Sequence, residues 1–244
     1  MQRYTFYEHF YELKQRFIKI FIFFLLTCFI CYCFSNEIYR IILNPLIDAI
    51  GEKGRKVIFT GLTEAFFSYI KISIFTSMIL TFPVCCYQIY AFIKPGLNRN
   101  EKSIISVTLA LSPLLFYIGI LFMFYIVMPN AWLFFISYEN TNIGLPLVLE
   151  AKISEYITLV VQLTLAFGIC FQLPIAVIIL SAMGLITAEL LRKKRRIAIV
   201  AIFIVAAIFT PPDVFSQIAL AVPLLLLYEV SVWLCLAIEK KRVD

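Results

Sequence analysis

The chain is poor in the residues on which most catalytic and metal sites depend. It has a single histidine, His9, and charged residues make up only 15% of its 244 residues. No HExxH, GxSxG, P-loop or GxGxxG motif occurs, and no aspartate lies within the apolar segments. These absences exclude the common metalloprotease, hydrolase, nucleotide-hydrolysing and dinucleotide-binding classes. We therefore expect neither an enzyme nor a bound cofactor.

Cysteine does not make up for the missing histidine. A zinc site needs cysteine or histidine pairs on accessible loops, and no such pairs occur here. The cysteines all lie within apolar segments, where they are best interpreted as small buried hydrophobic side chains. We expect no metal site and no disulfide from the seven of them, at positions 28, 31, 33, 85, 86, 170 and 235.

Long apolar segments dominate the chain. Hydrophobic residues make up 62% of it, and its mean hydropathy is +0.95. A membrane-spanning helix needs about 20 mostly apolar residues. We expect one transmembrane domain over residues 1–244, with no folded basic surface left for nucleic acid, and six spans near 17–35, 67–92, 104–128, 156–183, 197–209 and 214–236.

The basic residues predict how these spans are oriented. Fifteen of the 21 lysines and arginines fall in four groups, which alternate with pairs of spans. Basic connections remain on the cytoplasmic-type side of a membrane. The fold class is therefore all-α, a polytopic membrane protein with both ends inside and basic groups at residues 3–19, 94–102, 192–196 and 240–242.

Prolines inside the spans indicate a bent bundle. Each removes a backbone donor and kinks its helix, which predicts a curved, cupped arrangement. Four spans contain one, at positions 83, 113, 174 and 223. We also expect a short helix on either side of Pro45 in the first outer loop, and a second outer loop over residues 129–155.

The fifth span and the turn after it are unusual. Residues 197–209 would extend only about 20 Å as a helix, less than the roughly 30 Å hydrocarbon core. The turn that follows contains two prolines between Thr210 and Asp213. We expect the Thr210 hydroxyl to cap the next helix and the Asp213 charge to favour its N-terminus.

Two acidic residues, Glu12 and Glu101, are predicted to lie on the inner side among cations. Each has an ordinary structural interpretation. Glu12 can pair with Arg16 one turn later, worth about 0.3–0.5 kcal/mol, and Glu101 can cap the third span. Alternatively, the two carboxylates form a clamp for guanidinium groups, which carboxylates bind with bidentate geometry.

Ionisable groups within the predicted spans are a further set of candidates. Glu229 falls well inside the sixth span, where an acid is costly and marks either a functional site or a hydrogen-bonded packing group. Gln172 and Gln217 are possible partners for it. Lys71, near the outer end of the second span, is expected to extend its amine towards the interface.

The order of these residues resembles the TatC family, the core subunit of the twin-arginine protein translocase. The N-terminal HFYELKQRF at 9–17 is similar to the family's HLxELRxRL pattern, with phenylalanine at the leucine positions 10 and 17 and lysine at position 14. The resemblance covers nearly the whole chain. It continues through NPL at 44–46, TEAF at 63–66, FPV at 82–84, PGL at 95–97, RKKR at 192–195, FTPPDVFSQ at 209–217 and YE at 228–229.

The resemblance implies a signal-peptide receptor that moves folded proteins across a membrane, driven by the proton-motive force. It implies that Glu12 and Glu101 receive the arginine pair of the peptide, with Phe92 beside them. It assigns contact with single-span partner subunits, within an oligomeric complex, to Thr210 and Gln217. The membrane would be a bacterial inner membrane or an organellar one such as the mitochondrial inner membrane.

The resemblance also implies roles for prolines and identifies one departure. Pro45 would support the cup and Pro83 would shape the second span. Many family members have glutamate where this chain has Gln172, so an essential acid at that position is in doubt here. Two other interpretations remain open: a small-solute transporter or channel, and a purely structural assembly subunit.

Overall fold

The computed structural model describes residues 6–50, 58–59, 61–96, 99–137, 152–210 and 214–243. Within them the regular secondary structure is helical apart from one isolated β-bridge between Ile58 and Lys152. The elements are α1 (Phe6–Cys33), α2 (Ser35–Ile50), α3 (Glu64–Ile93), η1 (Lys94–Gly96), α4 (Arg99–Phe122), η2 (Met123–Val127), α5 (Met128–Ile136), α6 (Ile153–Cys170), α7 (Leu173–Ala182), α8 (Ala188–Lys193), α9 (Arg195–Phe209) and α10 (Val214–Val243). The expected all-α class is confirmed.

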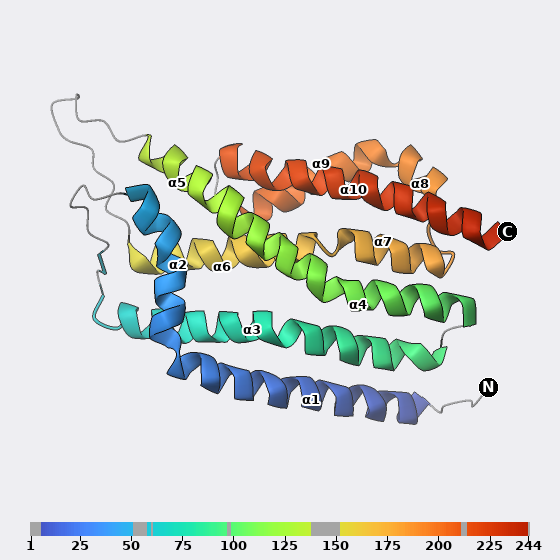
Figure 1. The fold of residues 1–244 in the computed structure, drawn as a ribbon, viewed down its shortest axis with the longest axis horizontal. Coiled ribbons are helices and arrows are strands. Elements are labelled where there is room, and N and C mark those ends of the chain that lie inside the picture. The colour runs from blue at the N-terminus through green and yellow to red at the C-terminus, as the bar shows by residue number, and fades with distance from the viewer. Residues whose placement is uncertain are drawn as a thin grey trace.

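The spanning helices run between two ends of a bundle (Figure 1). The start of α1 and the end of α10 lie at one end, which the basic groups identify as the inner end, and α2 lies across the outer end. Five described stretches are long and apolar enough to cross a bilayer: Phe10–Cys33, Glu64–Gly96, Lys102–Ile136, Ile153–Ala182 and Ser216–Lys240. Helix α9, the expected fifth span, is not among them: its 15 residues extend only about 22 Å, so a sixth crossing remains a prediction.

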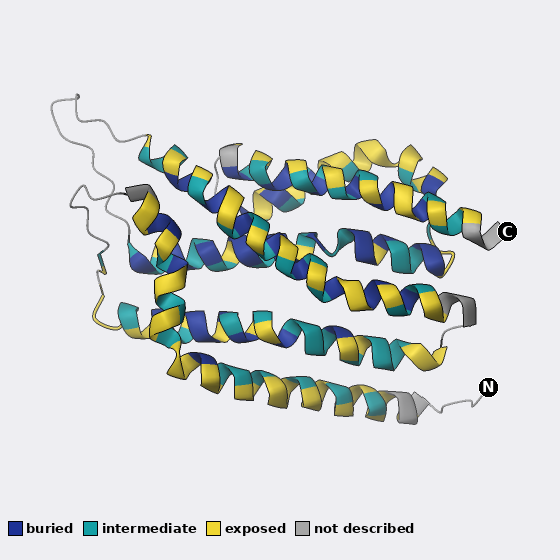
Figure 2. Cartoon of the chain, viewed as in Figure 1, coloured by how far each residue is buried: buried dark blue, intermediate teal, exposed yellow. Residues whose placement is uncertain are grey.

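Burial is greatest at α6 and least at α1. Just over half of the most apolar window of the α6–α7 stretch is buried, against 6% for the α1 stretch. Figure 2 shows the difference as dark blue along α6 and yellow and teal along α1. Among the spanning helices, α1 packs mainly against α3. It therefore forms an edge of the bundle, whereas α6 lies at its centre.

Two glycines allow α4 and α6 to approach closely. A Cβ at Gly119 would lie 2.8 Å from the carbonyl oxygen of Phe167, and a Cβ at Gly168 would lie 2.6 Å from the ring of Phe116. The Phe116 ring also stacks on Phe82 of α3, with centroids 3.8 Å apart. Small residues let helix backbones come together where lipid gives no hydrophobic driving force. The result is a tight contact that joins α3, α4 and α6.

Neighbouring helices supply hydrogen bonds close to two of the prolines. The Tyr117 hydroxyl of α4 donates to the carbonyl oxygen of Ile79, four residues before Pro83, at 3.2 Å. The Tyr156 hydroxyl donates to the carbonyl oxygen of Ile42, three residues before Pro45, at 2.6 Å. Only the Ile79 carbonyl is the one that its proline leaves without a backbone donor. A proline bend within a membrane is stable when such a freed group finds a partner.

Two expectations about the outer loops were wrong. Pro45 does not separate two short helices, because α2 continues through it from Ser35 to Ile50. The third span does not end before Pro129 either: a π-helical turn at η2 leads into α5, which extends to Ile136 with Pro129 in its first turn. A first-turn proline needs no backbone donor, so the helix can pass through it.

Candidate functional site

The inner end of α1 packs against the inner end of α3, and both carry predicted site residues. Glu12 lies in the second turn of α1, half-buried. Phe92 lies in the last turn of α3, also half-buried. After η1, only residues 97 and 98 precede α4, so the Cα atoms of Gly96 and Arg99 are at most about 11 Å apart. The first turn of α4, which contains Glu101, therefore lies near the end of α3.

Arg16 connects this part of α1 to α3. Its Nε donates to Oε1 of Glu12 at 3.0 Å, and its Nη2 donates to the same oxygen. Its Nη1 donates to Oε1 of Gln88 at 3.3 Å, and Nη2 also donates to the carbonyl oxygen of Ala91 at 3.0 Å. The predicted pairing of Glu12 with Arg16 is thus present, as part of a network that spans two helices.

The pattern at this patch is a guanidinium held by oxygen atoms. A carboxylate, a side-chain amide and a main-chain carbonyl supply them, and the arginine is the donor throughout. Another cation lies close by, because the Lys94 amine is 5.6 Å from the centroid of the Tyr90 ring. The Glu101 side chain lies outside the described residues, so the relation of the two predicted carboxylates remains a prediction.

Glu229 is not an isolated acid within the bundle. Its Oε2 accepts a hydrogen bond from Nη2 of Arg195, the first residue of α9, at 2.7 Å, and both side chains are a little under half exposed. Because α9 is short, its basic N-terminus reaches the level of Glu229 on α10. Neither Gln217 nor Gln172 bonds to it among the described contacts, so the suggested glutamine partners were wrong.

Gln172 bridges the break between α6 and α7 to α4. Its Oε1 accepts from the Ser112 hydroxyl at 2.5 Å, and its Nε2 donates to the Ser112 carbonyl oxygen at 3.1 Å. The Ser112 oxygen also lies 3.3 Å from the sulfur of Cys86 on α3. The side chain that replaces the family's common glutamate is therefore used on both its donor and acceptor sides.

The candidate residues near the outer end differ in burial, and the described ones already make hydrogen bonds within the protein. Thr210 is buried and donates to the Ala206 carbonyl at 2.8 Å at the end of α9. The cap that it was expected to supply to α10 involves residues 211–213, which lie outside the described residues. Gln217 is half-buried and donates to the Phe203 carbonyl at 3.3 Å. Asp213 lies outside the described residues. The Lys71 side chain is exposed, and its amine donates to the Thr158 hydroxyl near the start of α6 at 2.7 Å.

Sequence reasoning missed several partners in these contacts. Gln88, Ser112 and Tyr117 are ordinary polar residues within apolar segments, and nothing in their spacing distinguishes them. Arg16 was visible in the N-terminal motif, and its two bonds to α3 could not be inferred from α1 alone. Over the described residues, no group of three histidine, cysteine or acidic side chains could hold a metal ion.

Several known proteins resemble this chain in sequence and in fold. A family model described as "Sec-independent protein translocase protein (TatC)" matches residues 8–223. The chain belongs to the TatC family. A crystal structure of a twin arginine translocase receptor, TatC, superposes with a TM-score of 0.80 at 36% identity, covering 95% of this chain and all of that one.

Several relatives resemble the chain along most of their length. The Sec-independent protein translocase protein TatC of Rickettsia prowazekii is 51% identical over 242 residues, which cover 99% of this chain and 96% of the relative. The Escherichia coli K12 TatC is 37% identical, with 92% and 85% covered. An uncharacterized tatC-like protein, ymf16, of Reclinomonas americana is 35% identical, with 95% and 87% covered.

These similarities decide the general role of the chain. It is a multi-pass membrane protein of the TatC family, with the role of a translocase core subunit, and the small-solute transporter alternative is not favoured. The relatives are bacterial apart from the Reclinomonas protein. This distribution agrees with the expected bacterial inner membrane or organellar membrane.

Proposed function

We propose that the patch formed by Glu12, Glu101 and Phe92 receives the paired arginines of a signal peptide at the start of folded-protein transport. One observation supports this above the others: the inner ends of α1 and α3 already hold a guanidinium, that of Arg16, with oxygens from both helices. A surface suited to one guanidinium by its acceptor atoms is suited to others of the same chemistry.

Arg16 would act as the positioning residue of this patch. It directs two donors at a single oxygen of Glu12, which fixes the carboxylate on the α1–α3 surface. Glu101, in the first turn of α4, would supply the second carboxylate for the second arginine of the peptide. Phe92, beside Ala91, would provide an apolar surface for the peptide chain between them.

Partner contacts and energy coupling complete the proposal. Gln217, half-buried at the outer part of α10, would hydrogen-bond a polar residue of a single-span partner subunit, while buried Thr210 would hold the α9–α10 turn that presents it. Transport would draw on the proton-motive force, within an oligomeric assembly. Nothing in this role requires a catalytic step by the chain itself.

Peptide affinity tests the arginine patch directly. We expect Glu12→Ala and Glu101→Ala each to weaken binding of a twin-arginine peptide about tenfold or more, since a charge-assisted hydrogen bond contributes roughly 1.5–3 kcal/mol. Glu189→Ala is the matched control, because Glu189 is an exposed acid at the same end on α8. The double variant should bind twin-arginine and twin-lysine peptides equally. Unchanged affinity in both single variants would refute the proposal.

A further inference from the structure

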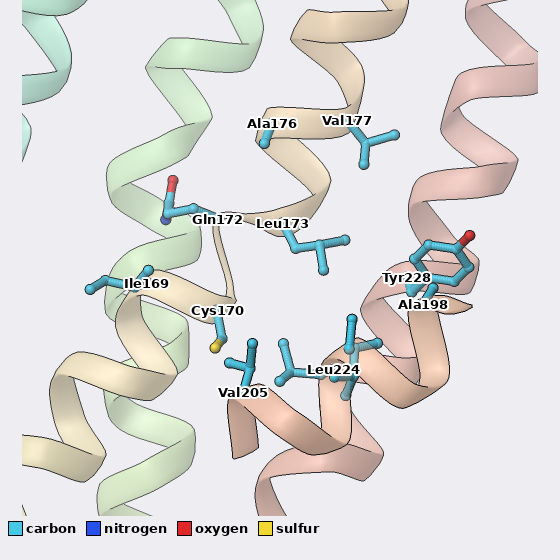
Figure 3. Close-up of a pocket in the computed structure, with 12 residues that line it drawn as sticks. Ile169, Cys170, Gln172, Leu173, Ala176, Val177, Ala198, Val205, Leu224 and Tyr228 are labelled. Carbon is cyan, nitrogen blue, oxygen red and sulfur yellow. The ribbon is translucent and has the colours of Figure 1, made fainter. Parts of the chain in front are cut away.

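An apolar groove lies between the α6–α7 break, α9 and α10. It has a volume of about 520 Å³, and its lining offers almost no polar surface. It is open at the side: Ala201 on one wall and Ile169 on the other are both exposed. Figure 3 shows the aliphatic side chains of Leu173, Val205 and Leu224 pointing into the space between the helices.

The two polar residues of the lining are turned away from the groove or already bonded. The Gln172 amide bonds to Ser112 on α4, on the far side from the groove. The Tyr228 hydroxyl donates to the Leu191 carbonyl of α8 at 2.7 Å. The groove therefore presents hydrocarbon to whatever enters it, and it has no free polar group with which to recognise a polar helix.

The inner mouth of the groove is basic. Ala198, Ala201, Ile202 and Val205 line it from one face of α9. Residues three and four positions apart share a helix face, so the next turn towards the inner end places Lys194 and Arg195 on that face. Both are exposed. Arg195 is partly neutralised by Glu229, which leaves Lys194 as the principal cation at the mouth.

This combination matches the two parts of one kind of molecule. A hydrocarbon chain fits the apolar groove, and a phosphate fits the cationic mouth. Three further exposed cations, Arg192, Lys193 and Arg196, add positive potential nearby. The acids of this region, Glu189, Glu229 and Glu239, are fewer than the basic residues at 192–196. We propose that the groove binds an anionic phospholipid of the inner leaflet, with an acyl chain between α7, α9 and α10 and its phosphate at Lys194.

The short length of α9 provides a physical reason for a lipid to bind at this position. At about 22 Å, α9 does not match a hydrocarbon core of roughly 30 Å. A mismatch of this kind is relieved when the bilayer thins or when flanking side chains reach the headgroups. A lipid whose phosphate binds at Lys194 would hold its headgroup at the level of the basic N-terminus of α9, so that the leaflet is thinner beside the short helix.

Native mass spectrometry of the purified full chain tests the proposal. The probe is detergent micelles that contain equal amounts of phosphatidylglycerol and phosphatidylcholine. We expect one phosphatidylglycerol to remain bound in preference to phosphatidylcholine. Lys194→Gln should lower its retention about fivefold, as expected for roughly 1 kcal/mol per cation near the phosphate. Ala201→Trp should remove most of the bound lipid by filling the groove.

Matched variants separate these effects from misfolding. Lys193→Gln removes a neighbouring exposed cation that lies off the groove face, and Ile199→Trp adds the same bulk on another face of α9. Both should retain phosphatidylglycerol. Equal retention of the two lipids, or unchanged retention in Lys194→Gln and Ala201→Trp, would overturn the proposal. So would an Ala201→Trp protein that keeps its lipid but loses photocrosslinking from position 205 to a single-span partner helix.

Discussion

The hydroxyl of Tyr117 on α4 donates a hydrogen bond to the carbonyl oxygen of Ile79 on α3, 3.2 Å away. In an unbroken helix this carbonyl would accept from the backbone amide four residues later, and that residue is Pro83, which has no amide hydrogen. The bend in α3 is therefore supported from a neighbouring helix. This contact leads to the first of four predictions.

Replacement of Tyr117 by phenylalanine should lower the free energy of unfolding by about 1 kcal/mol, because the Ile79 carbonyl loses its partner. Reversible unfolding in mixed micelles measures the change. Pro83→Ala restores the backbone amide and should make Tyr117→Phe nearly neutral in that background. An equal cost with and without Pro83 would show that the tyrosine does not support the bend.

Alanine at Gly119 should destabilise the protein by about 1–3 kcal/mol, the usual cost of overpacking. The added Cβ would meet a backbone oxygen, that of Phe167, at 2.8 Å, so no side-chain rotation can relieve the clash. Gly96→Ala serves as the control, because a Cβ there has no neighbour within 4 Å. Thermal unfolding of the two variants should differ clearly; similar midpoints would contradict the close α4–α6 contact.

Replacement of Gln172 by glutamate should destabilise the contact between α4 and the α6–α7 break by about 1–3 kcal/mol near neutral pH. An ionised carboxylate cannot donate to the Ser112 carbonyl, whereas a protonated one can. The loss should therefore be smaller at pH 5 than at pH 8. Gln172→Met removes both bonds and should show a deficit independent of pH. A pH-independent Gln172→Glu deficit would argue against the observed donor geometry.

Exchange of the charges at Arg195 and Glu229 should distinguish the contribution of the ion pair from that of each charge at its own position. Each single change, Arg195→Gln or Glu229→Gln, should cost about 0.2–1 kcal/mol, the range for partly exposed ion pairs. The combined Arg195→Glu and Glu229→Arg variant should recover much of that loss. A double-mutant cycle with the two glutamine variants and their combination gives the coupling free energy, and a value of zero would mean that the pair does not link α9 to α10.

The candidate patch at the inner ends of α1 and α3 was only partly predictable from sequence. The N-terminal motif identified Glu12 and Arg16, because paired charges at one-turn spacing are a property of a single helix. The bonds from Arg16 to Gln88 and Ala91 involve a residue more than 70 positions away, and no local pattern encodes such a contact. The partner of Glu229 was misassigned for the same reason: Arg195 on α9, and neither glutamine, bonds to it.

Hydrophobic length and the placement of positive charge can be read directly from the linear sequence. They alone predicted the helical class, the orientation of the ends and the short α9. Proline positions predicted bends but not their support. The direction of each bend, the oxygen atoms around Arg16, the double bond of Gln172 to Ser112 and the groove along α9 were decided only by packing. Helix–helix contacts depend on which faces of two helices pack against each other. Small residues and bends bring those faces together, and the residues involved are far apart in the sequence.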